Sequence, residues 1–253
     1  MELDKSVGNI HYIPIFLFVV IPATFITTYI IAVVLGHVEA GFPYISDTAA
    51  HSPESCIFAQ LINMAAGVLC LVIYIRYSQT KEISTSYQLN ASLPKWNKSG
   101  LILGLLTCFG LSVVANFQET NVLVVHALGA LLCFGCGTAY FWVQVVCSYY
   151  VHPLGCSLRI AHIRFCLALA NTIFFIVGII TTIIAGRLYN GDNVLKWYKE
   201  DGGWEFHVVS TVVEWLCAGC FCFYILTFTD EFRGIQLKRP KNIYYRSYSS
   251  QGT

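Results

Sequence analysis

Residues 13–35 read IPIFLFVVIPATFITTYIIAVVL, a stretch without a single charged side chain. A helix of about 20 apolar residues crosses the hydrocarbon core of a bilayer, which is about 30 Å thick. The apolar run is longer than the core of a cleaved signal peptide, and no Ala-x-Ala site follows it. We therefore predict that residues 13–35 form a membrane-spanning helix that stays in the protein.

Five further apolar stretches follow, at 56–77, 99–117, 122–149, 162–186 and 206–229. Of the 253 residues, 56% are hydrophobic and 11% are charged, whereas about a quarter of the residues in soluble domains are charged. The connections are short to moderate and no repeat is present, which favours one bundle. The sequence thus predicts an all-α, six-helix membrane domain over 1–237, followed by a basic and disordered cytosolic tail at 238–253.

The distribution of lysine and arginine predicts the orientation of the bundle, because cytosolic segments are enriched in these residues. One side of the predicted topology holds twelve of the fifteen basic residues, and the other side holds three. The twelve are Lys5, Arg76, Lys81, Lys95, Lys98, Arg159, Arg164, Arg233, Lys238, Arg239, Lys241 and Arg246; the three are Arg187, Lys196 and Lys199. Both termini are therefore predicted to lie in the cytosol.

The net charge of +1 gives no overall basic field, so nucleic acid is not an expected partner. The chain contains no phosphate-binding loop, nucleophile elbow or metalloprotease motif. We expect a protein that is not an enzyme, has no cofactor and is surrounded by membrane lipid.

Five polar residues fall in the predicted non-cytosolic half of the helices: Asn63, Asn116, His126, His207 and Glu214. Glu214 should lie roughly 12 Å below that face, at 1.5 Å per residue from the start of its helix. One interpretation is a polar pocket that opens away from the cytosol, with Glu214 as its charge. The other is hydrogen bonding between helices, at about 0.6 kcal/mol per bond, which is the commoner role of such residues.

Metal binding is the weaker interpretation of the histidines and cysteines. His207 and Glu214 are separated by roughly 10 Å along their helix, too far for two ligands of one ion. The pairs Cys133–Cys136 and Cys217–Cys220 are predicted at one mid-membrane level, but buried cysteines usually pack as small hydrophobes. We predict no metal site.

The segment before the second apolar stretch contains Pro43, Tyr44 and Asp47, a combination typical of an ordered turn. Together with Pro53-Glu54-Ser55-Cys56-Ile57-Phe58, Val114-Ala115-Asn116-Phe117-Gln118-Glu119, His126 and the stretch from His207 to Glu214-Trp215, this loop resembles the DRAM family of damage-regulated autophagy modulators. That family lies within a wider superfamily that includes the FRAG and Sfk proteins. The resemblance extends from about residue 12 to about residue 237.

The resemblance implies a non-enzymatic protein of lysosomal or other endomembranes that promotes macroautophagy and, in some members, cell death. It provides no catalytic residues, and the protein partners are unidentified. One alternative is a plasma-membrane scaffold that recruits a phosphatidylinositol kinase. Its basic tail would contact anionic phosphoinositides through Lys238, Arg239, Lys241 and Arg246. Another is a channel, transporter or lipid-handling protein that uses the polar pocket.

The predicted orientation can be tested through glycosylation. The sequons at Asn90 and Asn97 both fall in a segment predicted to be cytosolic, so neither asparagine should carry a glycan. Treatment with a glycosidase should leave the electrophoretic mobility of the protein unchanged. A shift in mobility would contradict the predicted topology.

Overall fold

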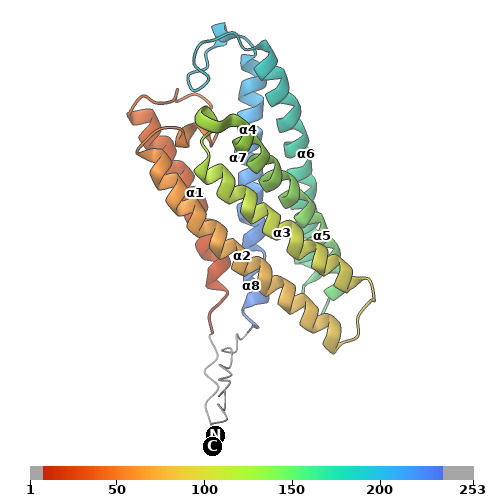
Figure 1. Ribbon diagram of the computed structural model, residues 1–253. Helices are drawn as coiled ribbons and strands as arrows, with labels where there is room; N and C mark the ends of the chain where they lie inside the picture. The colour runs from red at the N-terminus through yellow and green to blue at the C-terminus, as the bar shows by residue number, and fades with distance from the viewer. Residues whose placement is uncertain (1–7, 236–253) are drawn as a thin grey trace, which may run out of the picture.

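A computed structural model describes residues 8–235, and throughout these residues the regular structure is helical (Figure 1). Six helical spans are long and apolar enough to cross a membrane, as predicted. The elements are α1 (Tyr12–Val34), η1 (Asp47–Ala49), α2 (Glu54–Ser86), α3 (Leu93–Asn116), α4 (Glu119–Ala130), the π-helical η2 (Leu131–Cys136), α5 (Gly137–Val151), α6 (Leu158–Leu188), η3 (Lys199–Asp201), α7 (Trp204–Leu226) and α8 (Thr229–Phe232). The fourth span consists of α4, η2 and α5.

The helix α1 matches its predicted stretch to within one residue at each end, whereas α2, α3 and α6 extend beyond the apolar stretches that predicted them. The segment 78–98, predicted as a connection, is helical except at 87–92, because α2 continues to Ser86 and α3 begins at Leu93. Apolar patterning marks the part of a helix that lipid or protein covers, whereas a helix ends only where its backbone changes direction. Hydropathy therefore predicted the spans and underestimated their lengths.

The longer α3 changes what the two sequons can report. Asn97 is buried, and its side-chain amide donates to the Tyr77 carbonyl oxygen at 2.8 Å. No glycan fits at this position on either side of a membrane. Asn90, which is exposed between α2 and α3, is the informative sequon.

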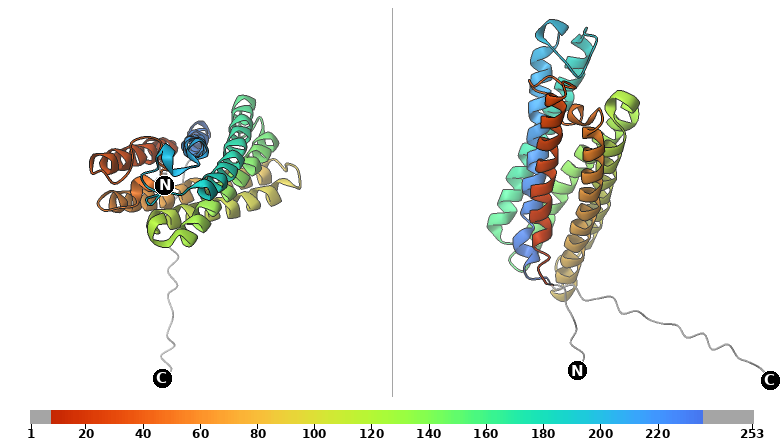
Figure 2. Two further views of the ribbon diagram at one scale, coloured as in Figure 1. Left: turned by 90° about the horizontal axis from the view of Figure 1, so that it is seen from above. Right: turned by 90° about the vertical axis from the view of Figure 1, so that its left-hand side faces the viewer.

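The six spans form a closed ring in which each packs against its neighbour in sequence and α7 packs against α1. Figure 2 shows this ring from above and α1 beside α7 from the side. We call the end that contains residues 8–12, 87–92, 152–157 and 227–235 the terminal end. The opposite end, with residues 35–53, 117–118 and 189–203, is the distal end.

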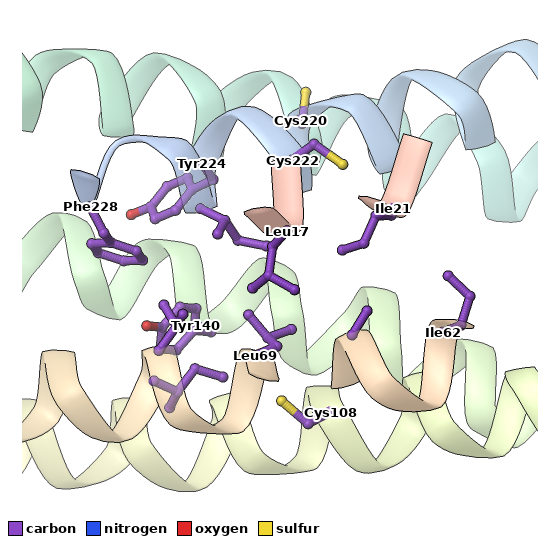
Figure 3. Close-up of a cluster of buried hydrophobic side chains, with 14 of the residues drawn as sticks. Leu17, Ile21, Ile62, Leu69, Cys108, Tyr140, Cys220, Cys222, Tyr224 and Phe228 are labelled. Atoms are coloured by element: carbon purple, nitrogen blue, oxygen red, sulfur yellow. The ribbon is translucent and has the colours of Figure 1, made fainter. Parts of the chain in front are cut away.

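The interior of the ring is filled with apolar side chains, several of which are shown in Figure 3. Aromatic rings occupy its terminal half: Tyr224 stacks on Phe141 with ring centroids 3.8 Å apart and meets Phe228 edge-on. The Tyr224 hydroxyl donates to the Phe141 carbonyl oxygen at 2.9 Å, so its polar atom is satisfied in the core. These rings close the terminal half of the bundle and leave a cavity of only about 20 Å³ between them.

Glycines allow α3 and the fourth span to approach closely. A Cβ atom on Gly110 would lie 2.5 Å from the backbone nitrogen of Cys133, and one on Gly129 would lie 2.6 Å from the Val113 side chain. Small residues permit such backbone contacts between membrane helices. Gly110 and Gly129 therefore let the backbones of α3 and the fourth span approach each other.

Two arginines that belong to the predicted cytosolic set are buried inside the bundle. Arg76 belongs to α2 and Arg164 to α6, and both pair with Glu231 of α8, at 2.6 and 2.9 Å. Removing them from the twelve leaves ten basic residues against three, so the predicted orientation does not depend on them. The basic tail residues Lys238, Arg239, Lys241 and Arg246 lie outside the described residues.

Hydrogen bonds and an aromatic ring complete this ion cluster. Arg164 donates to the Thr227 hydroxyl at 2.9 Å and to the Ser148 hydroxyl at 2.7 Å, and its guanidinium lies 4.5 Å from the centroid of Phe228. Arg76 donates to the Gln144 side chain at 3.2 Å. Two cations compensate one carboxylate, and the cluster joins α2, α5, α6 and α8 at the terminal end.

We expect Glu231→Gln to destabilise the protein by about 3–5 kcal/mol, because it leaves two buried guanidinium groups without their counter-charge. Asp230→Asn is the matched control, since Asp230 is the exposed neighbour and its pair with Arg233 is solvated. Thermal unfolding of the full chain in detergent measures both changes. Equal midpoints for the two variants would show that the cluster does not stabilise the fold.

Candidate functional site

The segment 36–53 folds over the distal end of the bundle and is held there by side chains from α1, α2 and α7. The Tyr29 hydroxyl donates to the Ala40 carbonyl oxygen at 2.9 Å, and the Trp215 indole donates to the Pro43 carbonyl oxygen at 3.1 Å. Glu54 lies at the start of α2, and its Oε1 is 2.5 Å from His37 Nδ1. The segment is an ordered part of the bundle.

Three consecutive loop residues contact the first residue of α4 and the first half of α7. The Tyr44 hydroxyl bonds to the Ser210 hydroxyl, and the backbone N–H of Ile45 donates to Glu214 Oε2 at 2.8 Å. The Ser46 hydroxyl donates to Glu119 Oε2 at 2.8 Å. The loop motif and the intramembrane glutamate, which the sequence presented separately, thus belong to one site.

Beneath this loop lies a cavity of about 400 Å³, within the size range of small-molecule sites. Its polar end contains Tyr44, Ser46, Glu119 and Glu214, and its apolar end extends between α4, η2, α6 and α7. The remaining lining residues are Leu123, His126, Ala127, Ala130, Leu131, Phe134, Phe174, Phe175, Gly178, Ile179, Thr182, Ile183, Ser210 and Cys217.

The polar end of the cavity is acidic. Asp47 is buried directly behind it and accepts the backbone N–H of Tyr44 at 2.9 Å. Burial, and then the neighbouring Glu119 carboxyl, raise the pKa of Asp47 well above its usual range. Burial likewise raises the pKa of the Tyr44 phenol to about 12, so this hydroxyl is a neutral donor and acceptor. No lysine or arginine lines the cavity.

The two predicted histidines occupy different positions. His126 lines the cavity; its Nδ1 lies 2.7 Å from the Phe117 carbonyl oxygen and therefore carries the proton, and its Nε2 lies 4.0 Å from Glu119. His207 lies outside the cavity, with its ring stacked on Trp197 and meeting the ring of Tyr44 edge-on. His207 therefore positions Tyr44, and His126 borders the cavity.

Asn63 and Asn116 are not part of the cavity. Their amides exchange hydrogen bonds of 3.0 and 3.1 Å across the contact between α2 and α3, and the Ser112 hydroxyl donates to Asn63 Oδ1 at 2.6 Å. Of the five polar residues that share a depth in the membrane, the cavity brings together only His126 and Glu214.

The cysteines of the chain are free thiols. Cys133 and Cys136 belong to η2, which packs against α3, while Cys217 faces the Asn171 carbonyl oxygen of α6. Within residues 8–235, no three His, Cys, Asp or Glu side chains are arranged to hold a metal ion.

Glu119, Ser46 and Ser210 are site residues that were not predicted from the sequence. Glu119 follows a predicted helix end, where a carboxylate ordinarily caps the next helix and faces water. The available signal was its position on the same side as Glu214, in the short connection between the third and fourth apolar stretches. Hydroxyl residues give no comparable signal, because they bond to their own helix backbone at low cost.

Comparisons with known proteins cover the whole of this bundle. The model for the Frag1/DRAM/Sfk1/Cwh43P N-terminal domain matches residues 9–235. DNA damage-regulated autophagy modulator protein 1 of Homo sapiens is 39% identical over 90% of this chain and 92% of its own length. DNA damage-regulated autophagy modulator protein 2 of Homo sapiens is 35% identical, over 93% and 89%.

A more distant relative is the modulator of macroautophagy TMEM150B of Danio rerio, 30% identical over 78% of this chain and 74% of that protein. No solved structure matches the chain. The family model and the relatives extend over all six spans and over the loop that roofs the cavity. The chain belongs to the Frag1/DRAM/Sfk1/Cwh43P family.

Proposed function

We propose that this protein is a multi-pass membrane modulator of macroautophagy that acts in lysosomal or other endomembranes without catalysing a reaction. The observation that carries the proposal is the similarity to two damage-regulated autophagy modulators over about nine tenths of the chain. The likeness to a modulator of macroautophagy supports the same role. A contribution to cell death, which the family resemblance implies for some members, is part of the proposal.

The geometry of the cavity favours lipid handling over conduction as the way such a protein acts. The cavity ends near Phe134 and Cys217, about halfway along the span. Below it, Phe141, Tyr224 and Phe228 fill the terminal half of the ring. Within the described residues, a solute would meet this aromatic packing before it crossed the bundle.

In the proposed arrangement the terminal end faces the cytosol and the distal end faces the lumen. The loop 36–53, Glu119 and Glu214 then form a lumenal site, and the basic tail is available to anionic lipid or protein partners. Recruitment of a phosphatidylinositol kinase by the tail is the alternative, and its residues lie outside the described part of the chain.

Removal of the protein should lower autophagic flux under starvation and after DNA damage. Flux is measured as the turnover of a lipidated autophagosome marker with and without a lysosomal inhibitor. Wild-type protein and the Asp230→Asn control should restore flux, whereas Glu231→Gln should not, because it removes the buried counter-charge of α2 and α6. Unchanged flux in both conditions after removal would overturn the proposed function.

The membrane in which the protein resides distinguishes the leading proposal from the scaffold alternative. Protein tagged at its N-terminus should coincide with lysosomal markers and not with plasma-membrane markers. Deletion of 233–253 should leave that distribution intact if the bundle itself is the functional unit. Plasma-membrane staining, together with loss of a phosphatidylinositol kinase from that membrane on deletion, would favour the scaffold.

A further inference from the structure

The cavity beneath the loop has the chemical asymmetry of an amphiphile. Carboxyl and hydroxyl groups gather at its distal end, and aromatic and aliphatic side chains such as Leu131, Phe134, Phe174 and Phe175 form the remainder. On α7 the lining extends from Ser210 to Cys217, roughly 10 Å along the helix axis. A molecule that matches it has a polar head near the distal end and an apolar chain directed toward the middle of the bundle.

The lining residues Ser210 and Cys217 of α7 are buried, whereas several lining residues of α4, η2 and α6 are exposed, so the cavity reaches the surface of the bundle between α4 and α6. Apolar side chains on both edges of the opening are exposed, with Leu123 at 64% and Leu131 at 55% on one side, and Ile179 and Ile183 on the other. Exposed aliphatic residues on a membrane-spanning helix contact lipid chains. The opening therefore faces the bilayer, so a ligand can enter from the hydrocarbon region without crossing water.

The charge at the polar end selects the head group. Glu214 Oε2 accepts the Ile45 N–H and Glu119 Oε2 accepts the Ser46 hydroxyl, while Glu214 Oε1 accepts no hydrogen bond from residues 8–235. His126 is the sole basic side chain in the lining, and its Nδ1 is occupied by the Phe117 carbonyl oxygen. An unpaired carboxyl group in an apolar setting is either protonated or paired with a cation, so a positively charged donor is the ligand that allows Glu214 to ionise.

Other amphiphiles match this site less well. A fatty acid or a phosphate-bearing lipid would place an anion beside Glu119 and Glu214, where like charges repel. A long-chain alcohol would offer a hydrogen bond but no compensating charge. An ammonium group offers up to three N–H donors and a positive charge, for which Glu214 Oε1 and the hydroxyls of Tyr44 and Ser210 are available acceptors.

We propose that this cavity binds a long-chain amine, a single alkyl chain with an ammonium head, which enters from the bilayer between α4 and α6. The head lies against Glu214 and Glu119 beneath the 36–53 loop, and the chain lies against Phe174 and Phe175 of α6 and Phe134 of η2. The inference rests on the cavity alone and not on the autophagic role.

The test uses the full-length protein in lipid nanodiscs and three photoreactive probes with the same tagged octadecyl chain: an amine, an alcohol and a carboxylic acid. The amine should label the protein, with crosslinks in peptides from 119–134 or 174–183. Untagged octadecylamine should compete with the label, and a short-chain amine of the same head group should not. Equal labelling by the three probes, or crosslinks spread evenly over the exterior, would overturn the proposal.

Paired variants test the head and the chain separately. Glu214→Gln should reduce amine labelling about tenfold, the loss expected for one charge-assisted hydrogen bond. Glu205→Gln, an exposed neighbour at the same end of α7, should leave labelling unchanged. Ala130→Phe should fill the apolar end and abolish labelling, whereas Ala23→Phe on the exposed face of α1 should not.

Thermal midpoints of the four variants identify any that fail to fold, and the competition on wild-type protein is independent of them. Labelling that survives both Glu214→Gln and Ala130→Phe in folded protein would place the amine elsewhere. If removal of the protein lowers autophagic flux but the amine does not label the protein, this inference is overturned and the proposed function stands. If the amine labels the protein but its removal leaves flux unchanged, the proposed function is overturned and this inference stands.

Discussion

The loop over the distal end of the protein is held by hydrogen bonds from the bundle, and the one that a carboxyl group of a membrane-spanning helix accepts runs from the backbone N–H of Ile45 to Glu214. A non-helical segment at membrane depth is tolerated only where its polar backbone groups are satisfied by protein. Glu214 provides that partner from inside the bundle, and Trp215 beside it donates to the Pro43 carbonyl oxygen. With these bonds in place the loop roofs a cavity; without them the loop backbone would have to turn outward to water.

The six spans follow from the sequence because the bilayer imposes a simple rule on length and polarity. The same rule does not apply to the polar ends of helices, so it did not predict the parts of α2 and α3 that extend beyond their apolar stretches. It also placed Arg76 and Arg164 among the cytosolic basic residues, although both are buried in the bundle. Both arginines pair with Glu231, which is about 155 residues from Arg76 and about 67 residues from Arg164 along the chain. The sequence around each arginine contains no signal for a partner at such a distance.

The sequence predicts how deep each polar site residue lies in the membrane, but it does not predict which way the side chain faces around its helix axis. Counting residues from the helix ends placed Glu214, His126, Asn63 and Asn116 at one level of the membrane. Whether such residues meet depends on which way each faces around its helix axis, and a helix without a clear polar stripe leaves that direction undetermined. The structure turns Asn63 and Asn116 toward each other and turns His126 and Glu214 toward the cavity.

The two buried acidic sites of the bundle are opposite in their charge balance. At the terminal end, Glu231 faces two arginines, so the cluster is closed and structural. At the distal end, Glu119 and Glu214 face a cavity that no lysine or arginine lines, with Asp47 directly behind them. The distal carboxyl groups are therefore either protonated or paired with a cation from outside the chain, and the ammonium head that we propose is such a cation. That imbalance, and not the presence of acidic residues as such, is the reason why we propose the distal cavity as a ligand site.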